Sequence, residues 1–306
     1  MNNIFKGYFL GALAAACYGL IPLFAVNLYN DGFNVDSVLF YRFFISILFL
    51  GMYLALKKES LLLKKKEILP VCFMGLLFAI SSFSLFMSYN YLNIGIASTL
   101  LFVYPIMVAL INFIFFSEKL SFFTIISILL AVLGIFLLSR TNDGSIISLC
   151  GITFVIISAF SYSIYMIAIN KSGISKLSPS KLTYYVLIFA LIFISLKLLR
   201  ENSLIIPKSI NNYENILGLA VFPTVISFIT LSMAIRLIGS TYTAILGALE
   251  PLTGVMVGII AFNEVVTYRI LIGIILILAA VTIIIFDKKL MSIIERKFFN
   301  RIHKHY

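Results

Sequence analysis

Charged residues are scarce in this sequence. They make up 11% of its 306 residues, whereas 62% are hydrophobic and the mean hydropathy is +1.11. Soluble domains carry about 25% charged residues. The scarcity of charge excludes a soluble globular protein and indicates an integral membrane protein with little chain left for a separate soluble domain.

Cysteine and histidine are also scarce. The three cysteines, Cys17, Cys72 and Cys150, lie far apart in separate apolar segments, and both histidines lie in the polar tail. This distribution argues against a disulfide framework and against a metal centre. The sequence also has no phosphate-binding loop and no Cys/His pair. It therefore predicts a protein that is not an enzyme, needs no cofactor and does not hydrolyse nucleotides.

Ten apolar segments of about 20 residues, the length that crosses a bilayer, are present instead. The first five are Phe5–Val26, Asp36–Leu56, Leu69–Tyr89, Ile96–Phe116 and Ser121–Ser139. The second five are Ile147–Asn170, Ser180–Leu199, Asn215–Ile235, Thr241–Ala261 and Tyr268–Phe286. The first segment continues into Pro22 and Phe24 without a small-residue cleavage site, so we expect a retained helix rather than a signal peptide.

Lysine and arginine predict the orientation of these spans. The net charge is +11, and the positive residues lie mainly in the short connections between spans. Most of them fall on the side that also holds both termini, including the run Lys64–Lys66. Because basic residues are retained on the inner side of a membrane, we expect both termini in the cytoplasm of a multi-pass protein of the cell (inner or plasma) membrane. Such a charge distribution does not suggest a nucleic-acid partner.

One stretch of the sequence is repeated within the chain. Residues 97–121 align without a gap with residues 243–267, and in this alignment Pro105 matches Pro251 and Glu118 matches Glu264. Weaker matches at offsets of 144 and 143 extend the repeat toward the N-terminus of each half. The sequence therefore predicts two repeats, 1–143 and 144–306, with five spans each. An odd number of spans inverts the second repeat in the membrane, a pattern typical of secondary transporters.

These features resemble one transporter family. Each half has a proline thirteen residues before a glutamate, Pro105…Ser117-Glu118 and Pro251…Asn263-Glu264, and the second half carries the pair Glu250-Pro251. The chain resembles the EamA type of the drug/metabolite transporter superfamily, although the residue before each glutamate departs from the usual glycine. The resemblance implies an all-α membrane protein of ten transmembrane helices in two inverted repeats that transports small organic molecules.

Two charged residues inside predicted spans are candidate substrate ligands. Arg42 lies about 9 Å and Glu250 about 16 Å from the outer end of its span, at about 1.5 Å per residue. Intramembrane charges usually face a cavity, so the two could pair or share a substrate. A carboxyl at that depth could also exchange protons. The alternatives are that Arg42 reaches to the outer interface and that Glu250 is a structural carboxyl bonded to backbone freed by Pro251.

Other residues support this predicted site. Six tyrosines are candidates for the lining of the cavity: Tyr18, Tyr41, Tyr104, Tyr162, Tyr165 and Tyr185. Pro105 and Pro251 could be fixed kinks or moving hinges. Glu118 and Glu264 lie just before Ser121 and Thr267, where free N–H groups of the next helix would favour a carboxylate, so we predict a structural role for both.

The sequence thus predicts a secondary transporter, embedded in the lipid bilayer, that works by alternating access on a small-molecule substrate bound in a central cavity between the halves. The resemblance implies export of amino acids, related amines or drugs, and Arg42 with Glu250 would suit a zwitterion. Two alternatives remain open, an importer of a nucleotide-like or vitamin-like metabolite and a membrane scaffold or sensor that transports nothing.

Overall fold

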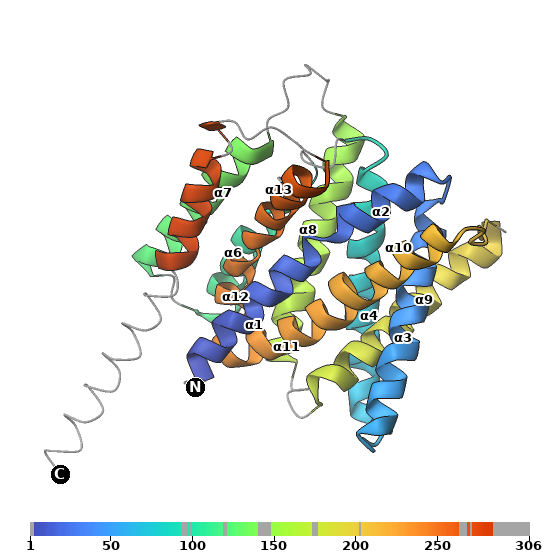
Figure 1. Ribbon diagram of the computed structural model, residues 1–306. Helices are drawn as coiled ribbons and strands as arrows, with labels where there is room; N and C mark the ends of the chain where they lie inside the picture. Colours follow the sequence, from blue (N-terminus) through green and yellow to red (C-terminus); the bar gives the residue numbers. More distant parts are fainter. Residues whose placement is uncertain are drawn as a thin grey trace, which may run out of the picture.

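The computed structural model describes residues 3–92, 97, 100–118, 121–139, 148–172, 177–201, 203–262, 268–269 and 271–283. All regular elements within these ranges are helices (Figure 1). The first half contains α1 (Asn3–Tyr18), α2 (Ile21–Asn30), α3 (Val35–Leu56), α4 (Lys65–Ser88), α6 (Tyr104–Phe116) and α7 (Phe122–Ser139). The second half contains α8 (Leu149–Lys171), α9 (Pro179–Glu201), α10 (Ile210–Ala220), the π-helix η1 (Val221–Ile226), α11 (Ser227–Ile238), α12 (Ser240–Leu246), α13 (Leu249–Phe262) and a last helix, Leu271–Ile283.

The helices follow the predicted spans in order. Six helical stretches in the described part of the chain are long and apolar enough to cross a membrane, and shorter apolar helices cover Tyr104–Phe116, Phe122–Leu137 and Leu271–Ile283. The first predicted span consists of α1 and α2, the eighth of α10, η1 and α11, and the ninth of α12 and α13. The all-α membrane class is therefore confirmed.

Helix packing relates the two halves by a pseudo-twofold axis. Gly7 of α1 packs against Ile238 of α11, and a Cβ added there would lie 2.5 Å from the Ile238 side chain. Gly151 of α8 packs against Leu92 just after α4, again with 2.5 Å to a would-be Cβ. Gly7 and Gly151 are equivalent in the repeat, and so are Leu92 and Ile238. The same close helix crossing therefore occurs twice. In one copy the glycine comes from the first half, and in the other it comes from the second half.

A second pair of contacts obeys the same symmetry. Ser227 Oγ of α11 donates to the Ala14 carbonyl of α1 at 2.9 Å. The equivalent residues Ser81 of α4 and Ser158 of α8 are joined by hydroxyls 3.1 Å apart and by a bond from Ser158 Oγ to the Ser81 carbonyl at 2.8 Å. In this way α1 pairs with α11 as α8 pairs with α4. Each of these pairs joins the two halves, so the repeats are interlocked rather than side by side.

Several spans are broken near their middles. The break between α1 and α2 falls at Gly19–Leu20, and the break between α12 and α13 at Gly247–Ala248. The fourth span has its turn at Phe102–Val103, directly before Pro105 at the start of α6. Proline lacks the N–H that a continuous helix needs, and broken helices are tolerated at membrane depth where other protein groups satisfy the freed backbone. The fourth and ninth spans break at equivalent positions.

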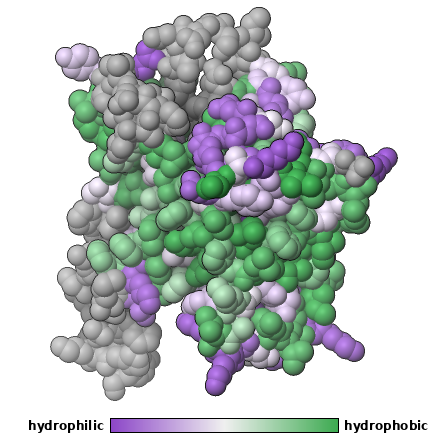
Figure 2. Space-filling model, turned by 45° about the vertical axis from the view of Figure 1, so that its right-hand side comes forward, coloured by the Kyte–Doolittle hydropathy of each residue, from purple (hydrophilic) through white to green (hydrophobic). Residues whose placement is uncertain are grey.

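The outer surface is apolar around the middle. Figure 2 shows a hydrophobic band between hydrophilic ends, as expected for a protein that contacts lipid chains. Large apolar side chains are highly exposed on the surface, for example Leu196 on α9 and Phe115 on α6. Exposed apolar side chains of this size are stable in a bilayer and would be unfavourable in water.

The connections gather on two faces of the molecule. On the first, which we call the lysine-rich face and define by residues 57–64, 172 and 177–178, Lys181 Nζ donates to the Ser60 and Leu62 carbonyls at 2.6 and 2.9 Å. On the second, the opposite face around residues 31–37 and 203–209, Asn34 donates to the Ser203 carbonyl at 2.8 Å. Each face thus joins connections from both halves, as the predicted topology requires.

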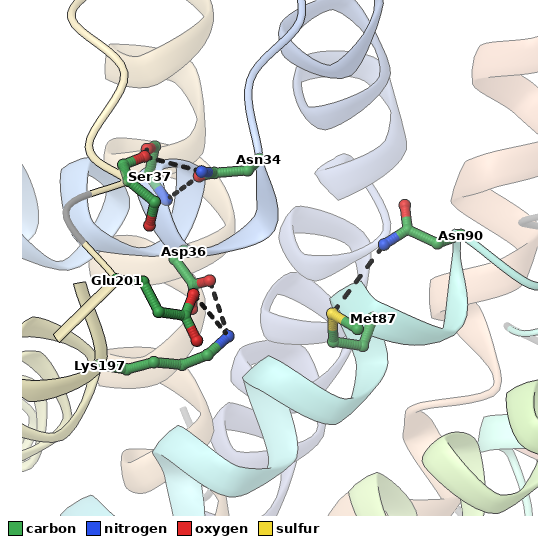
Figure 3. Close-up of polar contacts among 8 residues, drawn as sticks. Asn34, Asp36, Ser37, Met87, Asn90, Lys197 and Glu201 are labelled. Atoms are coloured by element: carbon green, nitrogen blue, oxygen red, sulfur yellow. Dashed lines mark hydrogen bonds and ion pairs between the residues drawn. The ribbon is translucent and has the colours of Figure 1, made fainter.

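The opposite face also carries an ion pair. Lys197 of α9 lies 2.8 Å from Asp36 of α3 and 3.9 Å from Glu201 (Figure 3). Asp36 is 8% exposed at its side chain, whereas Lys197 is 36% exposed. A half-exposed pair of this kind contributes little to stability by itself, but it holds the start of α3 against the end of α9.

The arrangement of the two faces can be tested by labelling. In a variant without native cysteines, Leu62→Cys and Lys208→Cys, both at exposed positions, should react with an impermeant maleimide from opposite sides of the membrane. Leu62→Cys should react from the cytoplasm, because its connection carries the excess of lysine. Reaction of both variants from the same side would contradict the inverted repeat.

Candidate functional site

Arg42 lies inside the protein and not at its rim. The residue is 0% exposed, although its position on α3 would let a lipid-facing arginine reach the interface. Its Nε donates to Thr224 Oγ1 at 2.7 Å, and its Nη2 donates to the Pro223 carbonyl at 3.3 Å. Its Nη1 has no hydrogen-bond partner in the described part of the chain. The interpretation in which Arg42 reaches to the outer interface does not fit this burial.

The partner of Arg42 is a local distortion of the eighth span. The π-helix η1 contains Pro223, which cannot donate to the Leu219 carbonyl one turn earlier. Thr224 Oγ1 donates to that carbonyl at 2.8 Å and still accepts from Arg42. Ser46 of α3 adds a bond to the Ala220 carbonyl at 3.1 Å. Single π-turns of this kind are frequent at functional sites, and here the distortion supplies the acceptors that hold the guanidinium.

A layer of four tyrosines lies beside Arg42. Tyr18 stacks on Tyr162 with ring centroids 6.2 Å apart, and Tyr162 in turn contacts Tyr165 at 6.1 Å and Tyr104 at 5.1 Å. The Arg42 Cζ atom lies 5.8 Å from the Tyr18 ring centroid. Guanidinium groups are attracted to aromatic faces at this range. The layer therefore begins at Arg42 and leads across the middle of the protein.

The far end of the tyrosine layer meets Glu250. Tyr104 Oη donates to Glu250 Oε1 at 3.3 Å. These two residues are 146 apart and occupy equivalent positions, Tyr104 before Pro105 and Glu250 before Pro251. A contact between equivalent positions must lie close to the pseudo-twofold axis. Tyr18 and Tyr162 are also equivalent, so both pairs mark the centre of the molecule.

Two glycines at this centre provide space into which the opposite half of the protein packs. A Cβ on Gly247 would coincide with the Tyr104 hydroxyl, and a Cβ on Gly19 would collide with the Glu250 carbonyl oxygen and lie 2.8 Å from Thr253 Cβ. The break at Gly247 thus faces the Tyr104 hydroxyl, and the break at Gly19 faces the backbone of Glu250. The sequence places small residues where the backbone of one half must approach the other.

Arg42 and Glu250 do not pair in the structure. The ion pairs among the described residues are those of Lys197 with Asp36 and Glu201. The hydroxyl of Tyr18 interacts electrostatically with both Arg42 and Glu250, so the layer lies between the two charges. Glu250 is partly accessible to solvent, whereas Arg42 is not. The centre therefore holds a separated cation and carboxyl, each with an incomplete set of partners.

Two of the predicted tyrosines, Tyr41 and Tyr185, lie apart from this centre, whereas Pro105 and Pro251 directly follow Tyr104 and Glu250. Tyr41 packs against Phe33 and Phe40 near the opposite face. Tyr185 donates to the Leu61 carbonyl at the lysine-rich face and contacts Tyr184. Pro105 and Pro251 occupy the first turns of α6 and α13, where a missing N–H costs no helical bond.

Glu118 takes part in a polar contact between the halves. Its Oε1 accepts from Thr241 Oγ1 at 3.3 Å, at the beginning of α12. The fully buried Asn112 of α6 donates to Ser240 Oγ at 2.9 Å and to Thr241 Oγ1 at 3.0 Å. Within the described residues, Glu118 thus bonds to the ninth span, where α6 and α12 pack together. Glu264 lies outside the described residues.

Some residues of the centre escaped the sequence analysis. Pro223 and Thr224 anchor Arg42, although a proline followed by threonine within an apolar span was a usable signal. Gly247 gave no signal before its neighbour Tyr104 was placed in space. Tyr29 and Tyr89 are near span ends, where tyrosine is usual, yet both interact electrostatically with Arg42.

Comparison with known proteins agrees with this architecture. A model of the EamA-like transporter family matches the chain twice, over residues 5–140 and 149–286. Two relatives from Archaeoglobus fulgidus, each named an uncharacterized transporter, are 29% identical over 123 residues and 26% identical over 196 residues. The first match covers 40% of this chain and 43% of that relative, and the second covers 62% and 67%.

A solved structure shares the fold. It is described only as the crystal structure of a protein, and it superposes with a TM-score of 0.79 at 14% identity, over 90% of this chain and 95% of the other. At this level of identity the likeness concerns the arrangement of helices alone.

The close approach at Gly247 gives a stability prediction. Gly247→Ala should lower the thermal unfolding temperature in detergent, because its Cβ would displace the Tyr104 hydroxyl and overpacking typically costs about 1–3 kcal/mol. Gly254→Ala on the same span is the matched control. The nearest atom to its Cβ, the Gly19 carbonyl oxygen, is 4.0 Å away, and alanine is about 1 kcal/mol more favourable than glycine within a helix. Equal stability of the two variants would contradict the packing described.

Proposed function

The chain belongs to the EamA-like transporter family, and from that premise we propose that it is a secondary active transporter of a small organic metabolite that works by alternating access. The observation that carries the proposal is the Tyr104–Glu250 hydrogen bond, which joins equivalent positions of the two halves. Groups near a pseudo-twofold axis keep their place when inverted halves exchange conformations. A substrate held there can be approached from either side in turn.

The broken helices support the same mechanism. The fourth and ninth spans break beside the axis, and the first span breaks at Gly19 against the Glu250 carbonyl. Discontinuous helices at the interface of inverted repeats typically form the binding sites of secondary transporters. A break also lets the outer and inner parts of a span tilt separately. The position of the breaks therefore favours a site at the centre whose two sides open alternately.

The charges at the centre favour an amino acid or a related amine as cargo. The described residues offer no anionic partner for Arg42 and no cationic partner for Glu250. A zwitterion would supply both, with its carboxylate toward Arg42 and its amine toward Glu250. Phosphate-bearing cargo should require several cations, and Lys197 is engaged with Asp36. Export from the cell is the direction that we propose, by the family resemblance.

Transport by the purified protein tests the proposal. Liposomes that contain the protein should take up labelled amino acids or amines from a panel, and unlabelled cargo on the far side should speed the uptake by exchange. An equal amount of heat-inactivated protein is the control for leakage. If no member of a broad metabolite panel enters above that control, under either a pH gradient or exchange conditions, the transporter proposal fails.

Glu250→Gln separates the roles that Glu250 can have. The amide keeps the shape and can still accept from Tyr104, but it cannot ionise, so transport driven by a pH gradient should fall by at least tenfold. Substrate exchange should persist, because that half-cycle needs no net proton movement. The protein should still fold, since a neutral amide is cheaper to bury than a carboxylate.

The other outcomes of this variant are equally informative. A structural carboxyl would tolerate the change in both assays, and a ligand for the amine alone would lose both through weaker binding. Unchanged pH-driven flux in Glu250→Gln would end the proposal of proton coupling. Net flux and exchange should be measured in the same preparation, so that differences in protein amount cancel.

A further inference from the structure

Three polar side chains surround the buried ring of Phe86, beside the tyrosine layer. Phe86 of α4 is 0% exposed, and the Arg42 Cζ atom lies 5.6 Å from its ring centroid. The rings of Tyr29, on α2, and Tyr89, at the end of α4, lie 6.4 and 5.7 Å from the same centroid. Phe86 therefore brings a guanidinium and two phenols from three helices into one neighbourhood.

This neighbourhood contains buried donors without acceptors. Arg42 Nη1 and the Tyr29 hydroxyl are inaccessible to solvent and make no hydrogen bond within the ranges described. The hydroxyls of Tyr29 and Tyr89 each interact electrostatically with Arg42. A buried donor that lacks a partner costs free energy, and a bound ion, water or ligand is one way in which such a group is satisfied.

The charge of the site is also unbalanced. Two nitrogens of Arg42 donate hydrogen bonds to neutral acceptors, the Thr224 hydroxyl and the Pro223 carbonyl. Asp36, which interacts electrostatically with Tyr29, is bound to Lys197 at 2.8 Å. An isolated buried cation is strongly unfavourable. The free Nη1 and the two phenols offer hydrogen-bond donors around one positive charge, which is the chemistry that holds a single carboxylate.

We propose that Arg42 Nη1 and the hydroxyls of Tyr29 and Tyr89 form a carboxylate subsite. The subsite deepens the proposed transport function and rests on it, because it assigns the anionic group of the cargo to residues that the central tyrosine layer does not include. It also defines the substrate class more narrowly. Cargo must carry a carboxylate, and amines without one are excluded from tight binding.

The repeat indicates that this subsite is single. The position equivalent to Arg42 in the second half is Tyr185, at the lysine-rich face, and the position equivalent to Tyr89 is Ile235. The second half therefore lacks both the guanidinium and this phenol at the equivalent positions. The carboxylate is therefore received on one side of the tyrosine layer only, which orients the cargo along the pathway.

Binding of simple carboxylates tests the subsite without knowledge of the natural cargo. The purified protein in detergent is titrated with sodium acetate at constant ionic strength made up with sodium chloride, and thermal unfolding is followed. Acetamide, which has the same shape without the charge, is the matched probe. We expect acetate to raise the unfolding temperature in a saturable way and acetamide to leave it unchanged.

Variants assign the effect to the residues proposed. Tyr29→Phe and Tyr89→Phe each remove one hydroxyl, so each should raise the half-saturating acetate concentration about tenfold, the loss expected for one hydrogen bond to a charged group. Tyr91→Phe, at an exposed position where the ring packs on Phe154, should behave as the unchanged protein. Arg42→Gln should abolish the acetate effect. If acetate and chloride stabilise equally, or if the phenylalanine variants respond as the unchanged protein does, the subsite is overturned.

The same preparation distinguishes this proposal from the transport proposal. Acetate binding that depends on Tyr29, Tyr89 and Arg42, in a protein that moves no cargo in liposomes, would support the subsite and contradict the transporter. Transport of an amine that lacks a carboxylate, with the same half-saturating concentration as its amino acid, would support the transporter and contradict the subsite.

Discussion

The hydrogen bond between Tyr104 and Glu250 is the contact on which the rest of the structure depends. It joins two residues that occupy the same position in the two repeats, so it can form only where the pseudo-twofold axis passes between the fourth and ninth spans. Both spans break next to this bond, at Phe102–Val103 and Gly247–Ala248, and Pro105 and Pro251 lie just beyond the breaks. The bond also requires a glycine at position 247, because any side chain there would collide with the phenol.

The two repeats share the same arrangement of helices but differ in the side chains at the centre and at the contacts between the halves. Tyr104 has a glutamate as its equivalent, Arg42 has Tyr185, and Asn112 has Gly258. Asn112 bonds to Ser240 and Thr241 across the halves at the lysine-rich face, whereas Gly258 has no side chain that could make such a bond. Under the proposed alternating-access mechanism, these differences make the two mirror-related states unequal in energy, with the contact between the fourth and ninth spans favoured at the lysine-rich face.

Much of the helical fold could be predicted from the sequence, because the thickness of the bilayer fixes the length of each apolar span. The repeat was visible in the paired prolines, and with it the inverted plan. The site was only partly predictable. The cost of a charge in lipid favoured an internal Arg42 without excluding one that reaches the interface, and the partners of Arg42 depend on a π-turn in another span. Tyr41 and Tyr185 looked equivalent to the central tyrosines because the sequence does not show which face of a helix meets which neighbour.

Distances across the two faces test the account most directly. One pair of spin labels, at Phe116 on α6 and Leu237 on α11, measures the separation of the two halves at the lysine-rich face. A second pair, at the equivalent positions Phe262 and Tyr91, measures it on the other side of the axis. The account predicts two populations in which a short distance in one pair accompanies a long distance in the other, with pH or cargo shifting the balance. A single unchanging distance in both pairs, or distances that lengthen together, would contradict alternating access around the Tyr104–Glu250 axis.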